Sequence, residues 1–165
     1  MIAAHYACAH LPRVAGVALL ASALNLSPHR GIRPWLIVRN LARLAAKSPR
    51  LARIVQPANK LVMTRVLGFH PRFSSEELFH GWCRVSFLDF EQHARMCETL
   101  RAANMPVLVA WTKDDRLIEA SLARRTAEAL PQSGPRLEFE TGGHMLVKTR
   151  AREISQSIEK WMRAW

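Results

Sequence analysis

Hydrophobic positions change their spacing twice along the chain. Residues 13–22, RVAGVALLAS, form a nearly continuous apolar run of strand length, which predicts a strand buried on both faces of a parallel sheet. The segment before it, MIAAHYACAH, is rich in alanine and stops ahead of Pro12, as a helix would. We therefore expect the chain to begin with a helix that is followed by a buried strand.

Helical spacing dominates residues 26–100. Pro49 should divide the stretch 33–55 into two helices, because proline disfavours helical backbone in the residue before it. The first of these two helices has an expected apolar face made of Val38, Leu41, Leu44 and Ala45.

Two later helices carry capping residues at their starts. Ser74 is followed three residues later by Glu77, which is the pattern of a capping box. Asp89 precedes FEQHARMCETLRAAN and is expected to cap the helix over that segment.

The last third alternates between short apolar strands and amphipathic helices. VLVAW, after Pro106, and RLEFE, residues 136–140, are the expected strands, and a helix that stops before Pro131 lies between them. A final helix is expected over residues 149–165. This alternation predicts parallel strands joined by right-handed crossovers. The expected fold class is therefore α/β, with about three parallel strands, flanking helices and a helical insertion after the first strand.

Composition narrows the class of protein without identifying its chemistry. A chain of 165 residues with 49% hydrophobic residues suits one folded domain, and no apolar run is long enough to span a bilayer. The cysteines Cys8, Cys83 and Cys97 are too widely spaced for a disulfide framework or a zinc site. We expect free thiols in a reducing compartment, the cytoplasm or, as the alternative, the mitochondrion. We expect neither a cofactor nor a metal.

Positive charge is concentrated in the first half. Residues 1–75 contain 11 of the 24 Lys and Arg residues and no acid, whereas residues 76–165 contain 13 residues of each sign. Arg39, Arg43 and Lys47 recur at four-residue spacing on one helix face. Such a face is either simply solvated or binds an anionic membrane or an acidic partner. Specific nucleic-acid binding is not expected, because no known motif is present and only 7% of residues are aromatic.

Polar side chains that could carry chemistry follow the last two strands. Asp114 and Asp115 come after VLVAW, and His144 follows RLEFE, 29 residues beyond Asp115 (144 − 115). Because neighbouring parallel strands end at the same edge of a sheet, both loops should face one crevice. A carboxylate there can hold the histidine in one tautomer, while the other ring nitrogen takes a proton from a nucleophile.

Two segments resemble the C-terminal part of the α/β-hydrolase fold superfamily, of the AB hydrolase-1 type. They are PVLVAWTKDDRLIEASLARRTAEALP and LEFETGGHMLVKTRAREISQSIEKWM. The resemblance implies that Asp115 is the orienting acid, since Leu117 and Ile118 follow it as in the family. It implies that His144, which follows two glycines, is the general base. Residues 2–22 resemble the helix and strand that follow the nucleophile of that superfamily.

The nucleophile that this resemblance requires is not in the sequence. The family places it in a G-x-S-x-G turn, and these 165 residues contain none. The superfamily also contains enzymes with an aspartate nucleophile, so the identity of the nucleophile, Ser or Asp, stays open. Ser22, Cys8 and Ser133 lie in contexts that do not suit a replacement. Thr112 and Glu119 stand where the family usually has Gly and Pro, but neither change removes a catalytic group. We therefore expect a truncated hydrolase that is inactive by itself.

The resemblance also divides a single domain into three parts. Residues 1–26 are the helix and strand after the nucleophile, 27–100 a helical lid with a connecting helix, and 101–165 the strands and helices that carry the acid and the base. A small ester or amide substrate would enter under the lid, and the glycines before His144 would leave room for it. The exposed edge of the first strand would need a partner or an oligomer. The alternatives are a non-catalytic basic module and an inert fragment that depends on a partner chain.

Overall fold

The structure is a computed structural model that describes residues 2–22, 24, 35–87 and 89–164. A short 3-10 turn, Leu11–Arg13, links the first helix to the first strand. The helices in chain order are α1 (Ile2–Ala9), α2 (Trp35–Ala46), α3 (Pro49–Arg65), α4 (Ser75–Ser86), α5 (Phe90–Ala102), α6 (Ala120–Ala129), α7 (Leu146–Thr149) and α8 (Ala151–Met162). None of these described helices is both long enough and apolar enough to cross a bilayer.

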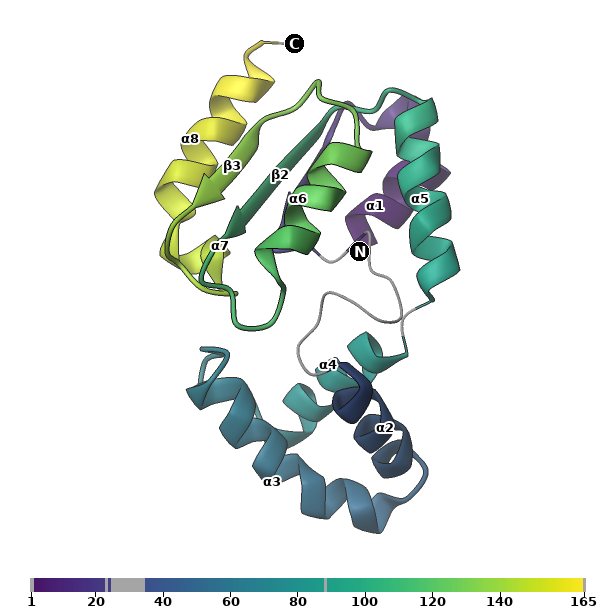
Figure 1. The fold of residues 1–165 in the computed structure, drawn as a ribbon, viewed down its shortest axis with the longest axis vertical. Coiled ribbons are helices and arrows are strands. Elements are labelled where there is room, and N and C mark those ends of the chain that lie inside the picture. Colours follow the sequence, from purple (N-terminus) through teal and green to yellow (C-terminus); the bar gives the residue numbers. More distant parts are fainter. Residues whose placement is uncertain (1, 23, 25–34, 88, 165) are drawn as a thin grey trace.

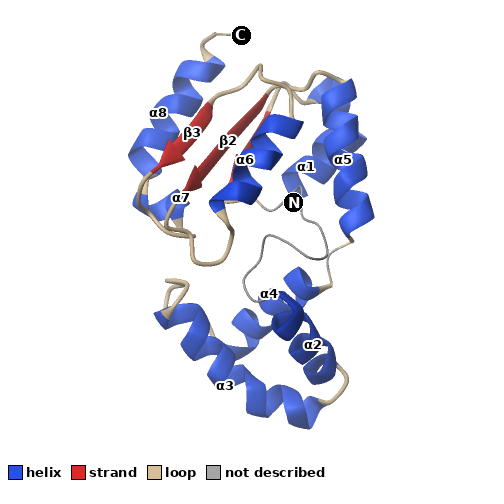
Figure 2. Cartoon of the chain, viewed as in Figure 1, coloured by secondary structure: helices blue, strands red, loops and turns tan. Residues whose placement is uncertain are grey.

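Three parallel strands form the sheet, in the order β1 (Val17–Leu20), β2 (Val107–Thr112) and β3 (Arg136–Phe139) (Figure 2). β1 and β2 are in register with Val17 opposite Val107, and β2 and β3 with Val109 opposite Arg136. All six side chains of the central strand β2 are buried, as the near-continuous apolar run VLVAW predicts. The expected parallel α/β fold is therefore confirmed.

Helices cover both faces of this sheet (Figure 1). On one face, Val107, Val109 and Trp111 belong to a core that also contains residues of α1, α5 and α6. On the other face, Leu108 and Ala110 pack with residues of α7 and α8. Successive side chains of a strand point to opposite faces, so a strand buried on both sides must be apolar at every position.

Helices α2, α3 and α4 form a separate group, which lies on the side toward which the strands point (Figure 1). Its core contains Ala42, Ala45, Phe79 and Trp82. The expected apolar face of α2 is partly wrong, because Leu41 and Leu44 are exposed and the alanines are buried instead. Small side chains allow α2 to approach its neighbours closely, so the alanine side faces inward. Val38 lies outside the residues whose side chains are described.

The predicted helix boundaries in this region are confirmed by their caps. Ser74 Oγ accepts the Glu77 N–H at 3.1 Å, and the Glu77 carboxylate accepts the Ser74 N–H at 2.7 Å, which completes a capping box. Asp89 accepts the Gln92 N–H at 3.0 Å at the start of α5. Ser48 caps α3, and Pro49 occupies its first turn.

Two predicted boundaries are wrong. The strand expected over residues 13–22 covers only Val17–Leu20, because a 3-10 turn precedes it and Ala21 adopts a φ of 45° that ends it. The helix expected over residues 149–165 is divided at Arg150 into α7, which begins earlier, and α8. Arg150 has a φ of −124° and a ψ of 25°, which lies outside the helical range and separates the two helices.

Leu108 should contribute far more to stability than an exposed leucine of the same chain. Leu108→Ala removes a fully buried side chain from β2 and should lower the free energy of unfolding by about 2–5 kcal/mol. Leu61→Ala in α3, where 61% of the residue is exposed, should change it by less than about 0.5 kcal/mol. Urea unfolding followed by circular dichroism measures both, and equal losses would contradict this core assignment.

Candidate active site

A histidine and an aspartate meet where β2 and β3 end. His144 Nδ1 lies 3.0 Å from Asp115 Oδ2, although the two residues are 29 positions apart. The Asp115 side chain is almost fully buried, with 4% exposed, while that of His144 is 18% exposed. The structure thus brings together the two residues that the sequence proposes as acid and base.

The loop after β2 holds the Asp115 carboxylate in place. Its Oδ1 accepts the N–H groups of Leu117 at 2.7 Å and Ile118 at 3.0 Å. These bonds close a local turn of the kind that aspartate forms with the backbone two and three residues ahead. Because Oδ1 is occupied by the loop, Oδ2 remains for the histidine.

The Asp114 carboxylate binds backbone N–H groups of the loop that carries His144. Its Oδ1 accepts the Gly143 N–H at 2.8 Å and its Oδ2 the Gly142 N–H at 3.2 Å. Burial raises the pKa of Asp114, but these glycine hydrogen bonds outweigh that effect and hold the pKa below its usual value. Sequence reasoning missed this role, although the adjacent pair of carboxylates was the available signal.

The two glycines before His144 are required by the backbone of the turn itself. Gly143 has a φ of +64°, and a Cβ there would meet nothing within 4 Å, so its backbone conformation is what requires glycine. Gly142 has a φ of +147°, and a Cβ there would lie 3.0 Å from Thr112 Cγ2 and from Thr149 Oγ1. Glycine is therefore required at 143 by its positive φ and at 142 also by the close approach of the protein itself. Both glycines border the cavity of about 250 Å³ at His144, and the room that they are expected to leave for a substrate stays a prediction.

Threonine hydroxyls fasten the carbonyl side of this turn. Thr112 Oγ1 donates to the Gly143 carbonyl at 3.0 Å, and Thr149 Oγ1 donates to the Gly142 carbonyl at 2.7 Å. Thr112 is one of the positions that depart from the family pattern, and its hydroxyl here has a specific partner. Both glycine peptides are consequently held on their N–H side and on their carbonyl side.

Two cavities of different character meet at His144. The first, of about 370 Å³, lies between this loop and helices α3 and α4, and its walls are mostly apolar side chains, including Met63, Phe69, Phe73, Leu78, Trp82 and Leu117. The second, of about 250 Å³, has mixed walls, in which the charged residues Asp114, Arg116 and Lys148 lie beside apolar ones. The Phe69 ring centre lies 6.2 Å from that of His144. His144 is therefore accessible from one mostly apolar cavity and from one that also carries charged groups.

None of the substitute nucleophiles considered from the sequence reaches these cavities. Ser22, Cys8 and Ser133 line neither of them. Burial raises the pKa of the Cys8 thiol, which keeps it in the less reactive protonated form. Ser133 precedes β3, at the amino end of the sheet, opposite His144.

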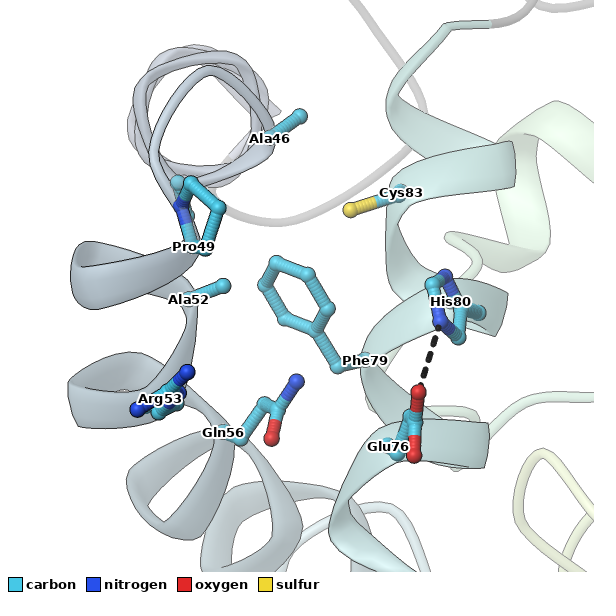
Figure 3. A pocket seen from close by; sticks show the side chains of 10 residues that line it. Ala46, Pro49, Ala52, Arg53, Gln56, Glu76, Phe79, His80 and Cys83 are labelled. Atoms are coloured by element: carbon cyan, nitrogen blue, oxygen red, sulfur yellow. Dashed lines mark ion pairs between the residues drawn. The ribbon is translucent and has the colours of Figure 1, made fainter.

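A third cavity, of about 470 Å³, lies within the α2–α4 group and does not include His144. Figure 3 shows the Phe79 ring pointing between α3 and α4, with Cys83 and His80 on the α4 side and Arg53 on α3. Glu76 lies 3.6 Å from His80 in an exposed ion pair. Burial raises the pKa of the Cys83 thiol, so this cavity provides no activated nucleophile either.

The other residues that could bind a metal or an anionic partner do not come together in one site within the described part of the chain. Within the described part of the chain, no group of three or more His, Cys, Asp or Glu side chains could hold a metal ion. The Arg43 guanidinium lies 5.8 Å from the centre of the Phe87 ring, and Lys47 is exposed. The Arg39 side chain lies outside the described residues.

Comparison with known proteins assigns this arrangement to a family. The model described as serine aminopeptidase, S33, matches residues 1–149. The chain belongs to this family of α/β-hydrolases. The resemblance stated from the sequence is thereby confirmed, and Asp115 and His144, the expected acid and base, lie within the matched residues. No protein among the curated ones matches it.

Solved structures of other α/β-hydrolases share the fold of this S33 family member. They include a candidate aryl esterase from Burkholderia cenocepacia (14% identity, TM-score 0.62), the enol-lactonase from Burkholderia xenovorans LB400 (18%, 0.59) and a thermophilic esterase from Thermogutta terrifontis (20%, 0.55). The matches cover 99%, 98% and 99% of this chain but 60%, 61% and 61% of those chains. The hydrolase chain described here therefore spans about 60% of their length, and at these identities the likeness shows the fold alone.

The turn before His144 should be sensitive to backbone strain. Gly143→Ala should lower the free energy of unfolding by about 1 kcal/mol, because alanine is strained at a positive φ. The substitution should also move the His144 ring relative to Asp115. Gly68→Ala is the matched control, since Gly68 has a φ of +75° and equally open surroundings. Thermal unfolding should show similar losses for both variants. Nuclear magnetic resonance of the His144 ring nitrogens should change in Gly143→Ala, and an unchanged spectrum there would refute the positioning role.

Proposed function

We propose that this chain supplies the acid and the base of a hydrolase for small esters or amides. Asp115 is the orienting acid and His144 the general base. The observation that supports this most strongly is the 3.0 Å contact between His144 Nδ1 and a buried carboxylate at the carboxyl edge of a parallel sheet. The order of acid and base along the chain, and the family assignment, agree with it.

The proton chemistry follows from which atoms are already engaged. Asp115 Oδ2 accepts the hydrogen on His144 Nδ1, so the neutral ring carries its free lone pair on Nε2. Nε2 can take the proton from an attacking hydroxyl and later return it to the leaving group. The imidazolium formed in between is stabilised by the Asp115 carboxylate, which burial makes more effective than it would be in water.

The nucleophile is proposed to come from polypeptide that is not among these 165 residues. The sequence contains no G-x-S-x-G turn, and the substitutes considered from it line neither cavity at His144. An apolar groove of about 840 Å³ runs beside β1 between α1 and α8, bordered by Tyr6, Gly16, Ala18 and Ile158. A strand from additional polypeptide or from a partner would cover it and continue the sheet. On this proposal the chain alone is a truncated, inactive form.

The substrate proposed is an ester or amide with an apolar group. The 370 Å³ cavity beside His144 offers almost entirely carbon surface, which suits an acyl chain or an aryl ring. The esterase and lactonase structures that share the fold agree with ester chemistry. We also propose the reducing cytoplasm as its location, because Cys8, Cys83 and Cys97 are all free thiols.

The isolated chain should not hydrolyse p-nitrophenyl esters above the background rate. A chain extended ahead of Ile2 by the earlier strands of the family fold and a G-x-S-x-G turn should do so. The extension restores the nucleophile, the oxyanion donor that follows it and the second donor from the loop after the third strand. In that longer chain His144→Ala should abolish turnover, and Asp115→Asn should reduce kcat by about 10³–10⁴-fold. If the isolated chain hydrolysed the ester and His144→Ala abolished that turnover, the proposal that the nucleophile lies outside these 165 residues would be refuted.

The acyl preference should depend on the width of the apolar cavity. Gly81 lies in α4 on the wall of that cavity, and a Cβ there would meet nothing within 4 Å. In the longer chain, Gly81→Leu should reduce kcat/KM for p-nitrophenyl hexanoate about ten-fold or more, while the acetate ester should change little. Gly81→Ala serves as the control, since it removes the helical glycine but adds little volume. Equal losses for both esters would place the acyl group elsewhere.

A further inference from the structure

Helix α3 exposes an apolar stripe on its outer side. Leu51, Ile54, Leu61 and Val62 follow each other at steps of three, seven and one residues, which places them on one side of a helix. All four are exposed, and Ile54 is 71% exposed. Figure 1 shows α3 along the boundary of the α2–α4 group, with its C-terminal end nearest the sheet. Helices of water-soluble folds usually turn such a stripe inward.

Folding of the α2–α4 group does not use this stripe. Other residues of α3, namely Ala52, Val55 and Met63, pack against the core that contains Phe79 and Trp82. α3 therefore has one apolar side that holds it in the fold and a second that faces solvent. The second side is available for an interaction outside the chain.

Cations accompany the apolar stripe, and acids do not. α3 contains Arg50, Arg53, Lys60 and Arg65, and no Asp or Glu occurs in residues 1–75. The three arginines are exposed, and none of them forms an ion pair with another residue of the described part of the chain. This positive charge is therefore not neutralised within the helix.

We propose that the outer side of α3 binds an anionic lipid surface. Aliphatic side chains enter the boundary between headgroups and acyl chains, and the cations pair with lipid phosphates, as in helices that lie in the plane of a membrane. The charge favours lipid over a second copy of this chain, because two copies with a net charge of +11 would repel each other. The aliphatic stripe favours lipid over nucleic acid, because a phosphate backbone offers no apolar surface that it could contact.

This surface lies next to the candidate active site. Met63 of α3 borders the apolar cavity at His144, and Val66 and Leu67, just after α3, border the cavity of about 250 Å³. Lipid contact along α3 would hold both cavities near the membrane surface. The proposal does not require the hydrolase function, since it depends only on the outer side of α3.

Vesicle sedimentation of the 165-residue chain tests the proposal. The chain should bind vesicles of phosphatidylcholine and phosphatidylglycerol in equal amounts far better than phosphatidylcholine alone, and salt should weaken this binding. The double variant Ile54→Gln, Leu61→Gln should reduce the partition coefficient about ten-fold or more. Arg50→Gln and Arg65→Gln should each reduce it about five-fold.

Matched variants separate this surface from general charge and exposure. Val147→Gln removes an exposed apolar side chain from α7, and Lys160→Gln removes an exposed cation from α8. Both should leave vesicle binding nearly unchanged, and circular dichroism should show that all variants remain folded. Equal binding by the wild type and the Ile54→Gln, Leu61→Gln variant would overturn the proposal. The proposal would also be overturned if the chain did not bind vesicles but formed oligomers through the stripe.

Discussion

The adjacent carboxylates Asp114 and Asp115 hold the two loops at the carboxyl edge of the sheet to each other. Asp115 binds its own loop with one oxygen and His144 with the other, whereas Asp114 binds the peptides of Gly142 and Gly143. Pairing of β2 with β3 sets how far apart the loops begin. The carboxylate hydrogen bonds then set how the histidine is oriented, so the site depends on both.

The α2–α4 group gives this polar pair its apolar surroundings. Its core of alanines, Phe79 and Trp82 holds α3 and α4 together, and side chains from both helices face the histidine loop as the wall of a cavity. A histidine at such a boundary can meet a substrate from the apolar side while the carboxylate behind it stays buried. The same packing leaves the stripe of Leu51, Ile54, Leu61 and Val62 outside, where the only charges on α3 are positive.

Patterns within a few neighbouring residues were sufficient to predict much of the fold. The apolar run of β2, the Ser74–Glu77 capping box and the Asp89 cap all have causes within one or two turns of chain, so the sequence alone shows them. The pairing of β2 with β3 also followed from the order of elements. The inward side of α2 did so only in part, because it depends on how closely the neighbouring helices approach. Ala45 is buried as predicted, but Ala42 is buried as well, while Leu41 and Leu44 are exposed.

By itself, the sequence determined the parallel α/β class and which carboxylate and imidazole would follow neighbouring strands, because strand alternation and residue order are local properties. Only the tertiary structure decided which carboxylate contacts which group: Asp115 contacts the His144 ring, and Asp114 contacts the Gly143 N–H. It also showed that Gly143 is required by its positive φ, and that α3 has two apolar sides of which one is exposed. These features depend on contacts between segments far apart in the chain, and such contacts leave no regular spacing in the sequence.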